Sequence, residues 1–283
     1  MLDRRSLGIA RWLRRAGLLV PFLVMLLPLT PAGAAIGGRG FVWVNADRVD
    51  QTPPMDSSVE KYDLTGGLTF GMVPPGEESP AHGRGIAVTS GGIVWYTVLL
   101  DIGPFVPVFV GDGLIHRTDT AGNPLPALPD PGGFHGPGIG ALDDTRKLLW
   151  AIDFNPGLVA HRVYGLDPAT GAVMARCLVT NTSSPSVALA VSGRTFLTDE
   201  GSGWQLFQFR LPTTVTSSGC TPVGGPFSLP FRTIGIDIAK GGRLLAADQE
   251  GVVHDLGGAP YDTSLGAFDT PATGAQDISA VSR

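Results

Sequence analysis

Two pentads of the same form, HGRGI at 82–86 and HGPGI at 135–139, each place a histidine four residues before an isoleucine. Imidazole changes its protonation near neutral pH, so His82 and His135 are candidate general bases and ligand contacts. Arg84, inside the first pentad, is a further candidate ligand contact. The glycines allow a close approach of the backbone. The repetition predicts that the two histidines occupy equivalent positions and share one site.

Acidic residues follow three apolar runs at matching positions. Counted from Trp150, Phe196 and Leu245, the third residue onward is an aspartate in every case. Several oxygen ligands of this kind suit Ca²⁺ or Mg²⁺. The metal-site candidates are therefore Asp153, Asp199 and Asp248, and the ligand-binding candidates near them are Asn45, Asp47, Asn155, Glu200 and Glu250.

A purely structural role is the alternative for each of these residues. Asp and Asn after a strand often cap a turn by accepting a hydrogen bond from their own backbone. A repeat would carry such a turn in every unit. A histidine before a glycine would then fill the entrance of the ring and bond a carbonyl.

The elements that must position these residues repeat along the chain. Five β-branched anchors are separated by 53, 48, 47 and 44 residues, and they are Ile86, Ile139, Val187, Ile234 and Ile278. After each of the first four come a polar turn, a second apolar run and a third run, as in IVWYT (93–97) and GLIHRTD (113–119). A period in the forties with four short strands per unit is typical of a β-propeller blade.

The fifth unit is split between the two ends of the chain. QDISAVSR ends the sequence after one strand, and GFVWVNAD at 40–47 and SVEKYDLTGG at 58–67 match the missing second and third strands. We therefore expect an all-β propeller closed by pairing of the C-terminal strand with the N-terminal blade. Five blades follow from the anchors, or six if the insertion around 99–113 forms its own. A β-sandwich would not explain the split repeat.

In such a blade, the residue before the innermost strand and the residue after the second strand lie on the same face near the axis. The candidate residues should therefore converge on a central funnel. Trp43, Trp95 and Trp150 recur on the second strand and are expected to pack between blades. His116, His161 and His254, on the third strand, are expected at the surface or the edge.

GGIVWYT…DGLIHRTDTAGN (91–123) resembles the repeat of the streptogramin (virginiamycin B) lyase family and of the related NHL and YncE-like propellers. YGLDPATGAVMARC (164–177) is similar to the DP-x-TG turn of YncE-like blades. The SMP-30/gluconolactonase propellers are a more distant likeness, based on geometry and acidic loops. The resemblance implies the propeller fold. The catalytic His/Glu arrangement of the lyase has no match here, so no catalytic residue is carried over.

Residues 1–35 form the pattern of an export signal. A basic leader precedes an apolar stretch from Ala16 to Leu29, and Ala32-Gly33-Ala34 supplies a cleavage site. That stretch is shorter than the roughly 20 residues of a membrane-spanning helix. We expect Sec export, or twin-arginine export on the arginine pairs, to the periplasm or outside the cell. The remaining chain, 36–283, is expected to be one propeller domain, monomeric and without a membrane anchor.

Two cysteines, Cys177 and Cys220, lie near the expected outer edge of neighbouring repeats. In an exported chain a disulfide between them would persist, and two isolated thiols are the alternative. Neither belongs to a C-x-x-C or Cys/His pattern, so a thiolate metal site is not expected.

Two functions remain open. The first is a binding module whose funnel face holds a small molecule, a glycan or a protein partner. The second is a divalent-metal-dependent lyase or lactonase in which His82 or His135 moves a proton. No G-x-S-x-G, Walker or H-E-x-x-H motif is present, so nothing in the sequence supports a serine hydrolase, an NTPase or a zincin. A net charge of −5 gives no reason to expect nucleic-acid binding.

Overall fold

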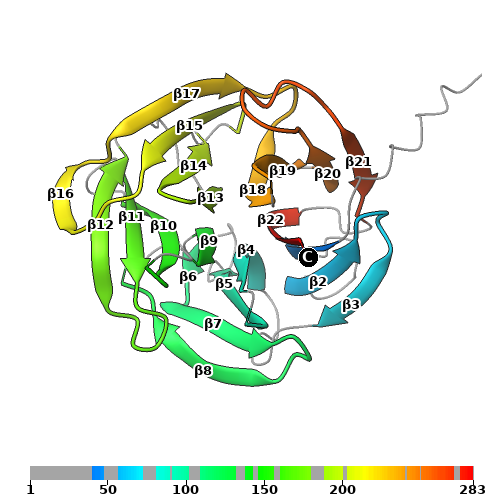
Figure 1. The fold of residues 1–283 in the computed structure, drawn as a ribbon. Helices are drawn as coiled ribbons and strands as arrows, with labels where there is room; N and C mark the ends of the chain where they lie inside the picture. Colours follow the sequence, from blue (N-terminus) through cyan, green and yellow to red (C-terminus); the bar gives the residue numbers. More distant parts are fainter. Residues whose placement is uncertain are drawn as a thin grey trace, which may run out of the picture. The chain divides into compact units, whose positions relative to one another are not determined.

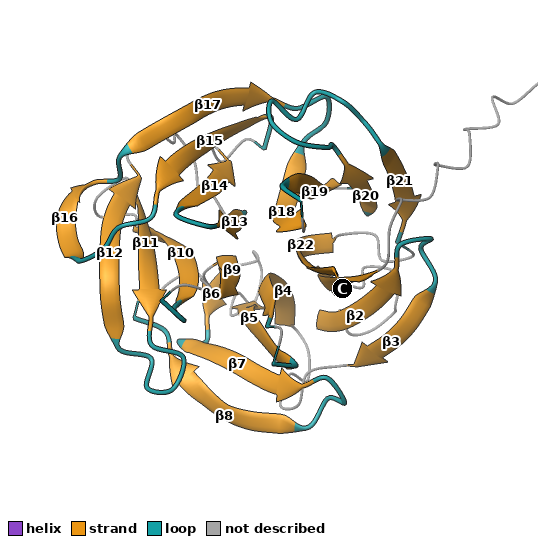
Figure 2. Cartoon of the chain, viewed as in Figure 1, coloured by secondary structure: helices purple, strands orange, loops and turns teal. Residues whose placement is uncertain are grey.

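The computed structural model describes residues 40–47, 57–72, 81–89, 91–101, 109–131, 138–142, 146–155, 160–179, 188–199, 203–239, 241–248, 250–270 and 275–282. The chain divides into two units, Met1–Ala32 and Gly33–Arg283, and all described residues belong to the second. The predicted signal, residues 1–35, lies outside them. Strands joined by turns make up the described chain (Figure 2). No described segment is a helix with the length and hydropathy of a membrane span.

The strands form five sheets arranged around a centre (Figure 1). From the centre outwards, the first sheet contains β22 (Ala275–Ser282), β1 (Gly40–Asp47), β2 (Ser57–Asp63) and β3 (Leu68–Met72). The second contains β4 (Ala81–Val88), β5 (Ile93–Asp101), β7 (Leu114–Asp119) and β8 (Pro124–Pro129). The third contains β9 (Gly138–Leu142), β10 (Leu149–Asn155), β11 (Ala160–Leu166), β12 (Val173–Val179) and β16 (Val215–Gly219).

The last two sheets complete the ring. The fourth contains β13 (Leu189–Ser192), β14 (Thr195–Asp199), β15 (Gln205–Arg210) and β17 (Pro222–Ser228). The fifth contains β18 (Thr233–Ala239), β19 (Arg243–Asp248), β20 (Val252–Asp255) and β21 (Gly266–Asp269). The inner strands contact one another in the closed order β22, β4, β9, β13, β18 and again β22. The predicted five-bladed propeller is confirmed.

The split first blade is also confirmed. β1 pairs antiparallel with β22 on one side and with β2 on the other, so that Val44 lies opposite both Ile278 and Glu60. Closure leaves no open inner edge on β1, which would otherwise invite pairing with another chain.

The insertion that left six blades open forms no blade of its own. Its described part contains one short strand, β6 (Phe109–Gly111), which pairs with the extended end of β5. The insertion therefore lengthens the second blade. The anchor Val187 lies outside the described residues, and its blade begins at Leu189.

The core lies between neighbouring blades. Trp43, Trp95 and Trp150 are each at most 2% exposed and belong to three different inter-blade clusters, as predicted. The Trp150 ring needs space on its partner strand, where Gly165 lies opposite it. A Cβ at Gly165 would come within 2.8 Å of the ring, so the residue type there is fixed by packing.

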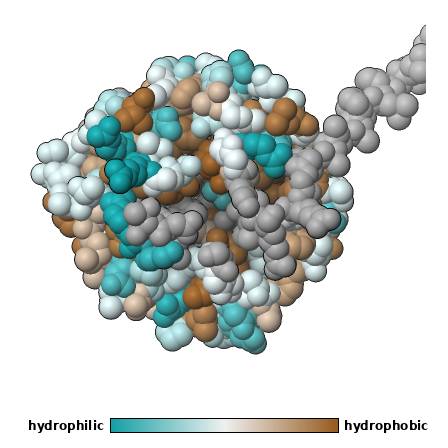
Figure 3. Space-filling model, in the orientation of Figure 1, coloured by the Kyte–Doolittle hydropathy of each residue, from teal (hydrophilic) through white to brown (hydrophobic). Residues whose placement is uncertain are grey.

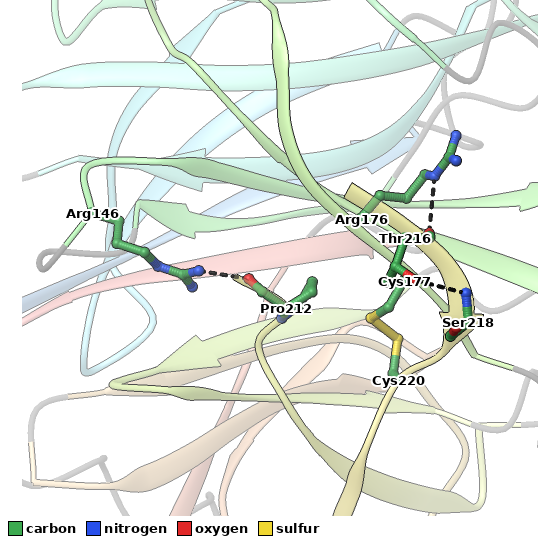
Figure 4. Close-up of a disulfide and its surroundings, with 7 residues drawn as sticks. All are labelled: Arg146, Arg176, Cys177, Pro212, Thr216, Ser218 and Cys220. Carbon is green, nitrogen blue, oxygen red and sulfur yellow. Dashed lines mark hydrogen bonds between the residues drawn. A yellow bond between two sulfur atoms is a disulfide. The ribbon is translucent and has the colours of Figure 1, made fainter. Parts of the chain in front are cut away.

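One connection crosses from the fourth blade to the third. After β15 the chain leaves its own sheet, and β16 pairs in parallel with β12 before the chain returns as β17. A disulfide between Cys177 and Cys220 holds this crossing, with the two Cα atoms 5.0 Å apart (Figure 4). The backbone N–H of Cys220 donates to Leu178 (2.7 Å). Of the two predictions for these cysteines, the disulfide is confirmed and the isolated thiols are wrong.

Replacing Cys177 and Cys220 by alanine should lower the free energy of unfolding by about 4 kcal/mol. The bond spans 43 residues, and its loss frees that loop in the unfolded chain. Denaturant titration of the oxidised wild type and of the double variant measures the difference. Reductant should shift the wild-type midpoint and leave the variant unchanged. Equal midpoints for both proteins would contradict this role.

Candidate functional site

All five second strands end in an acidic or amide residue. The residues are Asp47 of β1, Asp101 of β5, Asn155 of β10, Asp199 of β14 and Asp248 of β19. Strand register puts these ends beside the beginnings of the inner strands. Leu100 lies opposite Ala81, for example, and Asp248 lies opposite Thr233. The five strand ends therefore share one face of the ring, which we call the acidic face.

Asp101 was missed by the sequence analysis. The repeat predicts a second apolar run that ends at Thr97, whereas β5 continues to Asp101. The signal was present in the sequence, because IVWYTVLLD is one unbroken apolar run that ends in an acid, like the other second strands.

Asn45, a predicted ligand contact, connects the first two blades. Its side chain is fully buried, and its Nδ2 donates to the carbonyls of Gly85 and Thr97, 3.1 Å away in each case. An amide can satisfy two carbonyls at once because it carries two N–H donors. The described contacts of Asn45 therefore give it a structural role between β1, β4 and β5.

Asp153, a predicted metal ligand, is 1% exposed and forms an ion pair with Arg162, with 3.3 Å between Oδ2 and Nη2. The two residues lie directly opposite each other on β10 and β11. The Arg162 guanidinium also lies 5.5 Å from the ring centroid of Tyr164. Burial raises the pKa of the Tyr164 hydroxyl well above its usual range. The Asp153–Arg162 ion pair is therefore buried beside a tyrosine whose hydroxyl stays protonated at neutral pH.

The three predicted metal ligands do not face the same interface between blades. Residues on one strand alternate between its two sides, so each acid faces the same way as the residue two positions earlier. These earlier residues are Ala151, packed against the second blade, Leu197, packed against the fifth, and Ala246, packed against the fourth. Asp199 and Asp248 therefore both face the space between blades four and five, while Asp153 faces the space between blades two and three.

The alignment of Phe196 with Trp150 explains the difference. Both rings lie in the cluster between blades three and four, on opposite sides of it. Leu197, which faces the fifth blade, occupies the position equivalent to Trp150. Asp199 is thus two residues beyond that position, whereas Asp153 is three residues beyond Trp150.

Asp248 organises the turn after β19. Its Oδ1 accepts the backbone N–H groups of Glu250 and Val252, both at 2.9 Å, and its Oδ2 lies 2.9 Å from His254 Nε2. Burial raises the pKa of Asp248, but the hydrogen bonds from His254, Val252 and Glu250 outweigh it and hold the pKa below its ordinary value. The His254 ring stacks on Phe231 with 3.9 Å between centroids. Glu250 itself is exposed.

A second histidine–aspartate pair lies in the second blade. His116 Nε2 is 2.5 Å from Asp112 Oδ2, and the imidazole stacks on Tyr96 at 5.2 Å. The expectation that the third-strand histidines lie at the surface or the edge is wrong for His161. His161 is fully buried, while His116 and His254 are partly buried in these pairs.

Of the other predicted residues, Asp47, His82, Arg84 and Asn155 are described by their backbone alone. His82 and Arg84 lie in β4, the inner strand of the second blade, and His82 is opposite Leu99. His135 and Glu200 lie outside the described residues. Within the described part of the chain, no three His, Cys, Asp or Glu side chains come together as a metal-binding group.

Replacing Asp248 by asparagine should lower stability most at neutral pH. Because the pKa of Asp248 is depressed in the folded protein, its carboxylate stabilises the fold at pH values above the unfolded pKa of about 4. This contribution is lost as the pH falls through the depressed folded pKa. Denaturant midpoints of wild type and Asp248→Asn, measured between pH 7 and pH 2.5, should differ at pH 7 and converge below pH 4. A difference that stays constant with pH would contradict the assignment.

No protein-family model matches the chain, and no curated protein matches it by sequence. Among solved structures, it is similar to a protein of unknown function from Bacteroides caccae, with a TM-score of 0.52, 8% identity, and coverage of 86% of this chain and 99% of that one. It also matches the Neurospora crassa Pan2 WD40 domain, with a TM-score of 0.39, 12% identity, and coverage of 81% of this chain and 61% of that one. A further match is Myxococcus xanthus glutaminyl cyclase, with a TM-score of 0.43, 11% identity, and coverage of 67% of this chain and 76% of that one. The likeness to the Bacteroides caccae protein shows the fold alone. The chain is a five-bladed β-propeller, and its resemblance to the lyase, NHL and YncE-like groups remains a prediction.

Proposed function

We propose that this protein is an exported binding module that holds its ligand on the acidic face. The observation that carries the proposal is that every second strand ends there in a carboxylate or amide residue, four aspartates and one asparagine. The ligand is a small molecule, a glycan or a protein segment. Concave sites with convergent polar groups are the usual places for such ligands.

The charge of this face narrows the ligand class. The ends of β1, β5, β14 and β19 each carry a carboxylate, and a ring of like charges favours the approach of a cation. A ligand with an ammonium or guanidinium group, or one bridged by Ca²⁺ or Mg²⁺, would compensate them. The closed ring holds these ends at fixed spacing, which reduces the ordering cost of binding.

Binding without turnover is favoured over metal-assisted catalysis by what the described acids contact. Asp248 accepts hydrogen bonds at both oxygens, and Asp153 is paired with Arg162. A metal ion would have to replace these partners. The alternative is a lyase or lactonase that uses Ca²⁺ or Mg²⁺. In its favour, His82 lies in β4, whose beginning pairs with the end of β5 next to Asp101.

The test compares melting temperatures of wild type, Asp47→Asn/Asp101→Asn and a matched control, Asp119→Asn/Asp167→Asn. The control removes two acids from turns at the other ends of the blades. The probes are CaCl₂, MgCl₂, spermidine and a neutral oligosaccharide. A cationic probe at about a hundredfold excess over Kd should raise the melting temperature of wild type and control by about 5 °C or more. The acidic-face variant should lose this shift.

Two outcomes would overturn the proposal. The first is no saturable shift with any cationic probe in the wild type. The second is an equal shift in the acidic-face variant, which would place binding elsewhere. A Ca²⁺- or Mg²⁺-dependent shift together with consumption of a lactone or cyclic depsipeptide would establish the enzymatic alternative instead.

A further inference from the structure

A groove of about 770 Å³ lies between blades three and four on the face opposite the acidic face. The turn between β13 and β14 forms one wall, at the end of that hairpin away from Asp199. The crossing segment after β15 forms another wall. A volume of this size matches sites that hold small organic ligands.

Three arginines line this groove, and its described lining contains no acid. Arg146 comes from the turn before β10, Arg194 from the β13–β14 turn and Arg210 from the end of β15. In a chain of net charge −5, such a group is a local reversal of sign. Figure 3 shows strongly hydrophilic side chains gathered over the region where β11, β12 and β15 lie. Asp143 and Asp144, which precede Arg146 in the chain, lie outside the described residues.

The described contacts of Arg146 include one hydrogen bond and one aromatic ring. Its Nη1 donates to the carbonyl of Pro212 at 2.6 Å (Figure 4). Its guanidinium lies 4.9 Å from the Trp150 ring centroid. A planar guanidinium stacked on an aromatic ring keeps a fixed direction. The Pro212 contact also ties the crossing segment to the third blade. Arg146 therefore forms a rigid side of the groove.

Arg194 lies in the β13–β14 turn directly before β14, and Arg210 is the last residue of β15, the strand that pairs with β14. Thr195, which follows Arg194, is directly opposite Arg210 on β15. Both arginines are exposed, and neither side chain makes a hydrogen bond or ion pair with a described residue. Two like charges on neighbouring backbone positions repel each other, and no described contact of either side chain offsets that repulsion. An anion between them would.

The groove also has apolar walls. Leu211 is buried, with 3% of its surface exposed, and Val223 on β17 is exposed (43%). An inorganic ion would leave the Val223 side chain in contact with water. A ligand that combines an oxyanion with an apolar body would contact both the arginines and the apolar walls.

We propose that this groove binds a small organic dianion, either a phosphate monoester or a dicarboxylate, between Arg146, Arg194 and Arg210. Arginine forms paired, charge-assisted hydrogen bonds to both kinds of oxyanion, so three arginines match a charge of at least −2. The site is independent of the acidic face, and binding at one does not require the other.

Isothermal titration at low ionic strength tests the site with phenyl phosphate, phthalate and inorganic phosphate as probes. The variant is Arg194→Gln/Arg210→Gln, in which two exposed side chains are shortened and Arg146 keeps its structural contacts. The control is Arg232→Gln, which removes an exposed arginine between β17 and β18. The melting temperature of each variant without ligand shows that it is folded.

We expect wild type and control to bind phenyl phosphate or phthalate saturably, and more tightly than inorganic phosphate. The double variant should bind about tenfold more weakly or worse, because each arginine supplies charge-assisted hydrogen bonds. Tighter binding of one probe identifies phosphate ester or dicarboxylate as the ligand class. Failure of both organic probes to bind the wild type, or equal binding by the double variant, would overturn the proposal.

Discussion

Residues 40–47 and 275–282, the two ends of the described chain, pair with each other as the neighbouring strands β1 and β22. Every other feature of the ring depends on this pairing. It supplies the first blade with an inner strand, and that strand contacts β4 on one side and β18 on the other. With the ring closed, both sides of each blade are covered by a neighbour, and the tryptophans of the second strands are buried between them. Short strands that could not form a core alone share one through their neighbours.

Closure also gives the two faces different chemistry. Chain direction alternates within each blade, so the ends of the second strands, with their acids, gather on one face. The hairpin turns that join inner to second strands lie on the other. In blades three and four these turns, with the end of β15, carry arginines. The crossing segment held by the Cys177–Cys220 bond covers this same region. One scaffold therefore presents acidic strand ends on one face and an arginine-lined groove on the other.

The architecture could be predicted because its information is repeated. Five anchors and a unit shared between the termini define blade number and closure together, and only the length of the second unit left doubt. The structure removes that doubt because β6 pairs with β5. The disulfide was less predictable. The segment that carries Cys220 crosses to the sheet of another blade, and nothing in VTSSG indicates a parallel partner.

The candidate site was predicted less well, for a reason that follows from strand geometry. Side chains alternate with a period of two, so an alignment error of one residue moves a side chain to the other interface. Phe196 is aromatic and was aligned with Trp150, yet Leu197 has the equivalent packing. Asp153 thus faces the interface between blades two and three, whereas Asp199 faces the interface between blades four and five. Contacts such as Asp248 with His254, or Asn45 with the next blade, depend on blade spacing and carry no local sequence pattern.

Hydrogen exchange of the native protein tests most directly whether the ring is closed by β22. The account predicts that the amides of β22 that bond to β1 exchange as slowly as those in the pairing of β14 with β15, because both open only when the whole ring unfolds. Rapid exchange throughout β22, with β14 and β15 still protected, would contradict closure as the constraint on which the fold depends.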